Sequence, residues 1–341
     1  MCFEVLNLGI IGTNWITHQF VEAALESEAY QLKGVYSRSE KKAKKFAEKY
    51  QDVTDMVITE NFSEFIRSPQ LDVIYIASPN SLHFDQAQEA IQAGKHVIVE
   101  KPIVSTPSEL RELVDFAEEK EVFVFEAARH IHEVNFNIVK DMLKKREDVL
   151  GAQLNFMKYS SRYDAVLRGE EPNIFSPKYS GGALMDLGVY LIYAAVSWFG
   201  TPKEVFYFDQ KLPTGVDGIG TMIFRYDTFD ITLQTGKNAD CYLPSEIYLS
   251  DGTLTLDAVN SIEEITLKTR GKDQVTATEH AVKSDVNPMI AEALAFSNVI
   301  QNPFGVEEQK NYQEWIRLAI DVHDIMFELR EKSQIVFDAD Q

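Results

Sequence analysis

Over its first 125 residues the sequence alternates short apolar runs with segments of helical periodicity, and this alternation limits the fold more than any other feature. The run at 73–77, Val-Ile-Tyr-Ile-Ala, is typical of a strand buried on both faces of a parallel sheet. Strands are predicted at 5–11, 32–36, 73–77, 96–100 and 122–125, and helices at about 15–27, 40–50, 81–94 and 106–120. Repeated strand–helix–strand order predicts parallel strands with right-handed crossovers. We therefore expect an α/β domain with a doubly wound parallel sheet.

The pattern changes after Glu126. One or two helices are predicted within 132–146. Alternating strands with turn signals between them are predicted later, at 150–156, 204–208, 220–226, 229–234, 241–249, 252–256 and 265–268, which indicates a mostly antiparallel sheet. Two final helices are predicted near 286–301 and 309–331. The chain of 341 residues is long enough for two domains, which we place at 1–125 and 126–341. The last helix is a candidate to pack back on the first domain.

Charge and cysteine content exclude several classes of protein. With 53 acidic and 33 basic residues the formal net charge is −20, so the average surface repels nucleic acids and anionic membranes. No run approaches the roughly eighteen apolar residues of a membrane helix, and the start lacks the basic segment of a signal peptide. The two cysteines, Cys2 and Cys241, cannot form a disulfide framework or a four-ligand zinc site. We expect a cytoplasmic protein without a metal site, since His130 and His132 lack acidic or sulfur partners at ligand spacing.

A glycine turn lies between the first predicted strand and the first predicted helix, where dinucleotide-binding folds hold a pyrophosphate at a helix N-terminus. The three positions of the G-x-G-x-x-G pattern are filled by Gly12, Asn14 and Thr17. Asn14 is expected to adopt the left-handed backbone, and the larger Thr17 to push helix and strand slightly apart. An ordinary strand–helix turn is the alternative, and the effect of Asn14 and Thr17 on cofactor affinity stays open. The candidate cofactor-binding residues here are Gly12, Thr13, Asn14, Trp15 and Ile16, with Trp15 against the turn.

The end of the second strand indicates which dinucleotide binds. NAD-dependent enzymes usually place an acidic residue there for the ribose 2′-hydroxyl, whereas this chain has Tyr-Ser-Arg-Ser at 36–39. Arg38 can stack on adenine and donate to a 2′-phosphate, and Ser37 adds a hydroxyl. We therefore predict NADP(H) as the preferred cofactor, with NAD(H) as the alternative. Four lysines that follow, Lys41, Lys42, Lys44 and Lys45, are interpreted as a solvated helix face.

Several further motifs support one family. They are Gly-Ile-Ile-Gly-Thr at 9–13, Ala-Ser-Pro-Asn-Ser-Leu-His at 77–83, Ala-Gly-Lys-His-Val at 93–97, Glu-Lys-Pro at 100–102, and Gly-Gly-Ala-Leu-Met-Asp-Leu-Gly-Val-Tyr at 181–190. Together they resemble the glucose–fructose oxidoreductase / inositol dehydrogenase / MocA (Gfo/Idh/MocA) family over essentially the full length. The resemblance implies a Rossmann domain, then an α/β domain with an open, mostly antiparallel sheet that packs against its copy in a homodimer or homotetramer. It also implies NAD(P)-dependent hydride transfer on a small molecule, namely a sugar, polyol or related hydroxy compound.

The resemblance also implies roles for residues of the first domain. Lys101 of the Glu-Lys-Pro motif would reach the nicotinamide ribose and the substrate, with Glu100 beside it at the cofactor and Pro102 shaping the backbone. The residues that would line the cofactor are Ser78, Pro79, Asn80 and His83. The alternatives are that Asn80 or Ser81 only caps a helix, and that His83 is a surface residue.

The motif in the second half supplies the other candidates for catalysis. Asp186 and Tyr190 are four residues apart and so share one face of a helix, and Gly181 and Gly182 allow close approach to a ligand. Many relatives have histidine where this chain has Tyr190. Tyrosine resembles the branch that contains dimeric dihydrodiol dehydrogenases and NADP-linked xylose dehydrogenases, with which Arg38 agrees. The alternative is that Tyr190 is a packed aromatic with a satisfied hydroxyl.

The segment at 126–132 resembles a family segment that lines the substrate pocket, but it is one or two residues shorter than in that branch. The roles of Arg129 and His130 therefore stay open.

We hypothesise an NADP(H)-dependent dehydrogenase or reductase acting on CH–OH groups, with Tyr190 as general acid in reduction and base in oxidation. A free tyrosine has a pKa near 10, and the ammonium of Lys101 would lower it. Asp186 would bind a substrate hydroxyl or orient Tyr190. The alternatives are a non-enzymatic NADP(H)-sensing regulator or partner-binding protein on the same fold, and cleavage of glycosides with transient use of the cofactor. The substrate, the reaction direction and the choice between dimer and tetramer stay open.

Overall fold

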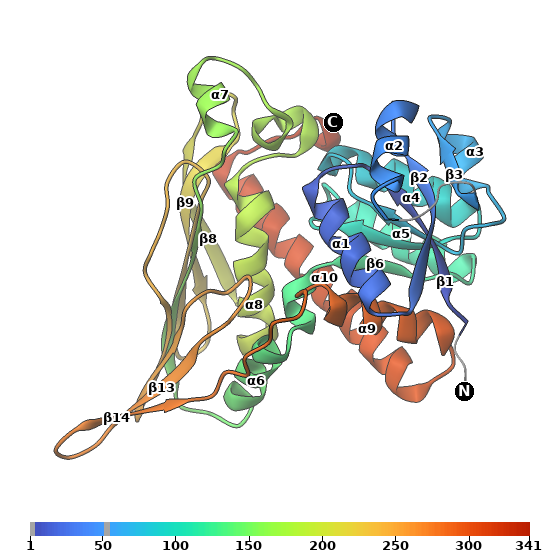
Figure 1. Ribbon diagram of the computed structural model, residues 1–341. Helices are drawn as coiled ribbons and strands as arrows, with labels where there is room; N and C mark the ends of the chain where they lie inside the picture. Colours follow the sequence, from blue (N-terminus) through green and yellow to red (C-terminus); the bar gives the residue numbers. More distant parts are fainter. Residues whose placement is uncertain (1–3, 51–54) are drawn as a thin grey trace. The chain divides into compact units, whose positions relative to one another are not determined.

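The computed structural model describes residues 4–50 and 55–341, so Cys2 lies outside the described residues. The chain forms two compact units (Figure 1). Unit 1 is Met1–Arg129 with Val286–Arg317, and unit 2 is His130–Asp285 with Leu318–Gln341.

This division differs from the two contiguous segments expected from the sequence, because the chain returns to unit 1 after residue 285. The hydroxyl of Tyr30 donates to the carbonyl of Ala293 at 3.0 Å, and the rings of Phe125 and Phe296 stack with centroids 4.6 Å apart. Residues 286–317 are therefore part of the core of unit 1 rather than of the second domain.

Unit 1 contains a six-stranded parallel sheet in the order β3-β2-β1-β4-β5-β6. This order is that of a Rossmann fold and confirms the predicted doubly wound sheet. The strand at the β3 edge was missed by the sequence analysis because it has three partly exposed residues and hence no apolar run. The strands are β1 (Leu6–Ile11), β2 (Tyr30–Tyr36), β3 (Val57–Thr59), β4 (Val73–Ile76), β5 (His96–Glu100) and β6 (Val124–Ala127).

Apart from the short α3, for which no helix was predicted, the helices of unit 1 begin within about four residues of their predicted positions. Thr106 and Glu109 form a capping box with Pro107 in the first turn, which sets the start of α5. Ser81 does not begin a helix as expected, because residues 80–82 form a short 3₁₀ turn before α4. The helices are α1 (Trp15–Glu26), α2 (Glu40–Ala47), α3 (Phe62–Ile66), α4 (His83–Gln92), α5 (Pro107–Glu119) and α9 (Ile290–Gln301).

Unit 2 contains an eight-stranded sheet in the order β14-β13-β12-β11-β7-β10-β9-β8. Only the pairing of β10 with β7 is parallel, which confirms the predicted mostly antiparallel sheet. The strands are β7 (Val149–Met157), β8 (Glu204–Lys211), β9 (Asp217–Arg225), β10 (Asp230–Gly236), β11 (Ser245–Leu249), β12 (Gly252–Leu256), β13 (Ile265–Arg270) and β14 (Val275–Glu279).

The core of unit 2 lies between this sheet and the helices on one of its faces, which Figure 1 shows as α6 and α8. Buried and partly exposed residues alternate along the central strands, as in a sheet with one covered face. Phe208 of β8 points to the other face and is 64% exposed. The helices are α6 (Val134–Leu143), α7 (Tyr163–Leu167) and α8 (Val189–Phe199), and the long α10 (Val306–Ser333) contributes to both units.

One stretch of unit 2, Pro177–Phe199, is long and apolar enough to cross a membrane by length and composition. This corrects the expectation that no run approaches that length. The stretch meets these requirements of length and composition because it has few charged residues. However, 72% of its most apolar window is buried within the protein, as in a core helix.

His96, at the start of β5, is expected to make unit 1 less stable in acid. Its Nδ1 accepts a hydrogen bond from the backbone N–H of Phe123 at 3.0 Å, which only an unprotonated Nδ1 can do. Burial lowers the pKa of His96 to about 4, with the charge of Asp72 opposing. Between pH 6.5 and 4 the unfolded state therefore binds the extra proton. The resulting stability is complete above pH 6.5 and is lost, on the order of 3 kcal/mol, as the pH falls towards 4.

Urea unfolding of the wild type and of His96→Gln at pH 7.5 and pH 5 measures this contribution. The glutamine oxygen can accept the same hydrogen bond but does not titrate, so His96→Gln should lose less stability between the two pH values. An equal loss in both proteins would show that other buried groups carry the acid sensitivity.

Candidate functional site

The glycine turn joins the carboxyl ends of three neighbouring strands of unit 1. The N–H of Gly12 donates to the carbonyl of Tyr36 at the end of β2 at 3.3 Å, and the N–H of Ala77 after β4 donates to the carbonyl of Ile11 at 2.9 Å. Gly12 has φ +101°, and a Cβ there would lie 2.7 Å from the carbonyl oxygen of Ala77. Only glycine fits this conformation and this space. The turn follows β1, and the strand order of the sheet reverses between β1 and β4. Open α/β sheets bind their ligands at the carboxyl edge at such a point.

Asn14 does not adopt the left-handed backbone expected from the sequence. Its φ and ψ are −89° and −178°, because it is the N-cap of α1 and an N-cap residue takes an extended conformation. Its Oδ1 accepts from the N–H groups of Ile16 and Thr17 at 3.1 and 3.2 Å. Its Nδ2 donates to the carbonyl of Ala77 at 3.0 Å. Asn14 therefore fixes the first turn of α1 against the end of β4.

The other residues of this turn fit the binding of an anion. Thr17 is fully buried and its hydroxyl lies 3.3 Å from Oδ1 of Asn14. The third position of the glycine motif therefore accommodates a threonine in this chain. Trp15 is 70% exposed, and the first turn of α1 contains no acidic residue. The positive end of the helix dipole is thus not neutralised by the chain itself, which suits a pyrophosphate.

Ser37 and Arg38 directly follow Tyr36, whose carbonyl bonds to Gly12, so their backbone lies next to the glycine turn. Arg38 is exposed, as a residue for a charged ligand must be. The four lysines of α2 are exposed as well, while Ala43, Phe46 and Ala47 face the core. This confirms that the lysines form a solvated helix face.

His83 connects the segment after β4 with the segment after β5. It is fully buried, which contradicts the alternative that it is a surface residue. Its Nδ1 lies 3.0 Å from the carbonyl of Pro102 and its Nε2 lies 2.9 Å from the carbonyl of Ser78. Burial lowers the pKa of His83, and the two carbonyls oppose this effect. Both ring nitrogens thus contact the protein backbone, and His83 holds the two segments together.

The cap alternative for Asn80 and Ser81 is also not seen, since the N-cap positions of this helical segment are Pro79 and Leu82. The hydroxyl of Ser78 donates to Gln86 at 2.7 Å, which fixes the start of the segment.

Glu100 and Lys101 differ in their exposure. Glu100 is 8% exposed, and its carboxylate accepts from the hydroxyl of Tyr75 at 2.5 Å and from the N–H of Lys101 at 3.3 Å. Burial raises the pKa of Glu100, while Lys101 and Tyr75 lower it. The ring of Tyr75 is itself stacked on Phe20 at 3.9 Å. Glu100 is therefore the buried residue that supports the segment after β5. Lys101 follows it, is partly exposed and is joined to Pro102 by a cis bond.

In unit 2 the residues around Asp186 form a π-helix, Leu184–Gly188, that leads into α8. Such wide turns occur often at functional sites. The buried carboxylate of Asp217 fixes the start of the turn, accepting from the N–H of Leu184 and the hydroxyl of Tyr207, each at 2.6 Å. Burial raises the pKa of Asp217, and these two hydrogen bonds oppose it. Asp217 has no signal in the sequence, because it lies 33 residues from Leu184 and belongs to no motif.

Tyr190 lies in the first turn of α8 between two aromatic neighbours. The centroid of its ring is 4.8 Å from that of His130 and 5.5 Å from that of Phe156. Nε2 of His130 lies 3.2 Å from the carbonyl of Tyr190. The structure thus brings His130 to a predicted catalytic residue, whereas Arg129 belongs to unit 1, where its charge acts on Glu100.

A second residue that the sequence analysis missed is Lys237, directly after β10. Its ammonium lies 2.5 Å from Oδ2 of Asp186, although its side chain is only 2% exposed. A signal was present in the sequence: Ile231, Leu233 and Thr235 alternate into the core, and position 237 continues this series. A lysine at an inward position requires a partner.

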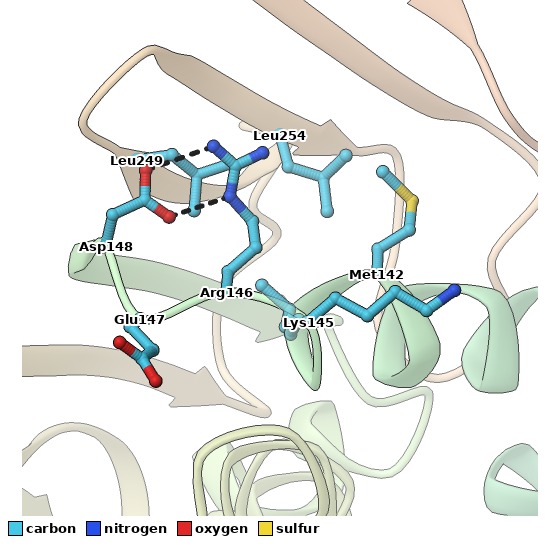
Figure 2. Close-up of a pocket in the computed structure, with 8 residues that line it drawn as sticks. Met142, Lys145, Arg146, Glu147, Asp148, Leu249 and Leu254 are labelled. Atoms are coloured by element: carbon cyan, nitrogen blue, oxygen red, sulfur yellow. Dashed lines mark hydrogen bonds and ion pairs between the residues drawn. The ribbon is translucent and has the colours of Figure 1, made fainter.

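The cavity drawn in Figure 2 lies elsewhere in unit 2, between the end of α6 and strands β11 and β12. It has a volume of about 390 Å³ and includes none of the predicted site residues. Arg146 in its wall is already bound by Asp148 at 2.9 Å and by Asp251. The cavity is therefore a poor match for an anionic ligand. In residues 4–50 and 55–341 no cluster of three or more His, Cys, Asp or Glu side chains could hold a metal.

Two family models match the chain. "Oxidoreductase family, NAD-binding Rossmann fold" covers residues 6–128, and "GFO/IDH/MocA C-terminal domain" covers residues 146–255.

Three proteins illustrate the similarity. The chain is 37% identical over 338 residues to a scyllo-inositol 2-dehydrogenase (NADP(+)) of Bacillus subtilis, covering 99% of this chain and 100% of that protein. It is 28% identical over 196 residues to a D-xylose 1-dehydrogenase (NADP(+)) of Hypocrea jecorina, covering 55% and 47% of the two chains. A 3-ketoreductase from Actinomadura kijaniata, solved with NADP and TDP-benzene, has the same fold with a TM-score of 0.82 at 20% identity, covering 96% of this chain and 98% of that one.

Proposed function

Because the chain belongs to the Gfo/Idh/MocA oxidoreductase family, we propose that it transfers a hydride between NADP(H) and a hydroxyl or carbonyl group of a sugar, polyol or diol. The observation that carries the proposal is the glycine turn at Gly12, which is enclosed by Ala77 and adjoins an exposed Arg38. The named relatives are NADP(+)-dependent dehydrogenases, which favours an enzyme over the regulatory alternative.

Unit 1 is proposed to bind the cofactor along the carboxyl edge of its sheet. The turn of Gly12, Thr13, Asn14, Trp15 and Ile16 would take the pyrophosphate, since it lies at a helix N-terminus whose first turn carries no acidic residue. Arg38 and Ser37 would bind the 2′-phosphate through charge-assisted hydrogen bonds. The segments held by His83 and Glu100 would shape the remaining part of the site through Ser78, Pro79, Asn80 and Lys101.

The cofactor, when bound, supplies or accepts the hydride, and the chain's own residues handle the proton. Tyr190 is proposed to give its hydroxyl proton to the substrate oxygen in reduction and to accept it in oxidation. Asp186 is proposed to accept a hydrogen bond from a further substrate hydroxyl, and Lys101 to donate one to the substrate oxygen. Removal of the Tyr190 hydroxyl or of the Lys101 ammonium should lower turnover without unfolding the protein.

The direct test is a fluorescence titration with NADPH and NADH, followed by a screen of NADP⁺ reduction with scyllo-inositol and D-xylose. Trp15 at the glycine turn should be quenched by binding. Arg38→Ala should weaken NADPH binding roughly 10- to 100-fold and leave NADH binding within about twofold, because only NADPH has the 2′-phosphate.

Lys45→Ala is the matched control, since it removes one exposed positive charge from α2 next to Arg38. It should change neither affinity by more than about twofold, because an exposed lysine makes a small contribution. Equal affinities of the wild type for both cofactors would contradict the NADP(H) preference, and binding of neither would contradict the oxidoreductase proposal itself.

We also propose that the protein is a cytoplasmic homo-oligomer that assembles through the open face of the sheet of unit 2. Exposed Phe208 and the partly exposed Phe206, Ile219 and Ile223 supply apolar area on this face. A free Cys241 is consistent with a reducing compartment. Sedimentation equilibrium distinguishes a monomer, which would contradict the proposal, from a dimer or a tetramer.

A further inference from the structure

Lys237 is buried to an extent that is unusual for a lysine. The residue is 1% exposed, and its backbone is fixed on both sides. Its N–H donates to the carbonyl of Gly218 at 2.7 Å, and its carbonyl accepts from the N–H of Ser160 at 2.8 Å. The backbone at Lys237 is therefore fixed by β9 and by the segment that follows β7.

The ammonium of Lys237 is placed against two groups of opposite character. One is the carboxylate of Asp186, with Nζ 2.5 Å from Oδ2. The other is the ring of Phe175, whose centroid lies 5.1 Å from Nζ and whose side chain is fully buried. A cation on the face of an aromatic ring and beside a carboxylate is stabilised by both. The ion pair of Lys237 and Asp186 thus has a defined geometry. Its acidic member is the more accessible one, because the side chain of Asp186 is 26% exposed.

Stability alone is a weak reason for this arrangement. Removing both charges from water is unfavourable, and buried ion pairs can often be replaced by apolar residues without loss of stability. The Asp186 carboxylate is held by Lys237, while the turn that carries it is held by Asp217 at Leu184. Two long-range contacts from neighbouring strands thus fix one carboxylate that lies four residues before Tyr190.

We propose that Lys237 is a positioning residue, which holds Asp186 as an oriented carboxylate so that it accepts a hydrogen bond from a hydroxyl of the substrate. This rests on the proposed function. The ion pair has no net charge, and the partly exposed member is the acid, so the arrangement favours an uncharged polyhydroxy compound over one with a carboxylate near this hydroxyl. Lys237 itself does not touch the substrate.

The test compares the steady-state kinetics of the full-length wild type with those of Lys237→Met and Lys237→Arg. The probe is scyllo-inositol or D-xylose with NADP⁺, and NADPH affinity is measured in parallel. Methionine keeps the apolar stem without the charge, so we expect kcat/KM for the probe to fall roughly 10- to 100-fold, with NADPH affinity within about twofold. Arginine keeps the charge and should recover part of the loss. A merely structural role would instead give a loss of kcat/KM that arginine does not recover.

Lys178→Met is the matched control, because Lys178 is exposed and lies 5.7 Å from the ring of Tyr179 in the same unit. It should change kcat/KM by less than about twofold. An active wild type with unchanged kinetics in Lys237→Met would overturn this inference alone. A wild type that binds no NADPH and oxidises neither probe would overturn the proposed function, and the inference with it.

Discussion

Replacing Tyr190 with phenylalanine is expected to lower kcat by roughly 10²- to 10⁴-fold, the usual contribution of a positioned general acid or base. The ring of Tyr190 packs between His130 and Phe156, and phenylalanine keeps both contacts. Folding and NADPH binding should therefore be retained. Steady-state turnover, an NADPH titration and a thermal melt of the same preparation separate loss of chemistry from loss of structure.

The matched control is Tyr193→Phe, one turn further along α8. Tyr193 is 1% exposed and its ring also contacts that of His130, with centroids 5.7 Å apart. We expect this variant to keep turnover within a few-fold, because the buried hydroxyl has no role in the proposed reaction. Turnover of Tyr190→Phe within a few-fold of wild type would rule out the acid–base role and leave Tyr190 as a packed aromatic.

Gly182→Ala is expected to reduce the free energy of unfolding by about 4 kcal/mol, which is a large part of the stability of a typical protein. Gly182 has φ +119°, which is unfavourable for any residue with a Cβ. A Cβ there would also overlap Oδ1 of Asp217. Displacing Asp217 breaks its hydrogen bonds to Leu184 and Tyr207, so the π-helix that carries Asp186 loses its anchor. Urea unfolding monitored by circular dichroism measures the loss.

Gly200→Ala separates backbone strain from overlap. Gly200 ends α8 with φ +82°, and nothing lies within 4 Å of a Cβ built there. This variant has the strain without the collision and should lose only about 2 kcal/mol. If both variants lost the same stability, the packing of Asp217 against Gly182 would contribute nothing to the anchor.

Much of unit 1 could be predicted because its signals are local in the sequence. Apolar runs such as 73–77 predict buried strands, and Thr106-Pro107 with Glu109 specifies a helix start within four residues. The prediction from local sequence was wrong for the backbone conformation of Asn14. Asparagine has a local preference for left-handed backbone, but capping of two N–H groups of α1 is the stronger interaction here and requires an extended conformation.

The candidate site could be predicted only in part. Gly12, Arg38, Asp186 and Tyr190 were identified from motifs, and the structure adds Lys237 and Asp217, which lie 51 and 33 residues from the positions they contact. His83 was expected at the cofactor or on the surface, and is buried between two backbone carbonyls. Such contacts depend on which strand ends are neighbours, and sequence spacing does not report that.

The sequence by itself determined most of the order of strands and helices, the place of the glycine turn and the absence of an acidic residue directly after β2, because each depends on residues close together in the chain. The tertiary structure decided which charged groups meet. Lys237 follows β10, which lies between β7 and β9, and it pairs there with Asp186. Asp217 is the first residue of β9, and its carboxylate anchors the turn of Asp186 at the N–H of Leu184. The physical reason is that burying a charge requires a partner, and the partner is supplied by strand register rather than by the neighbouring sequence.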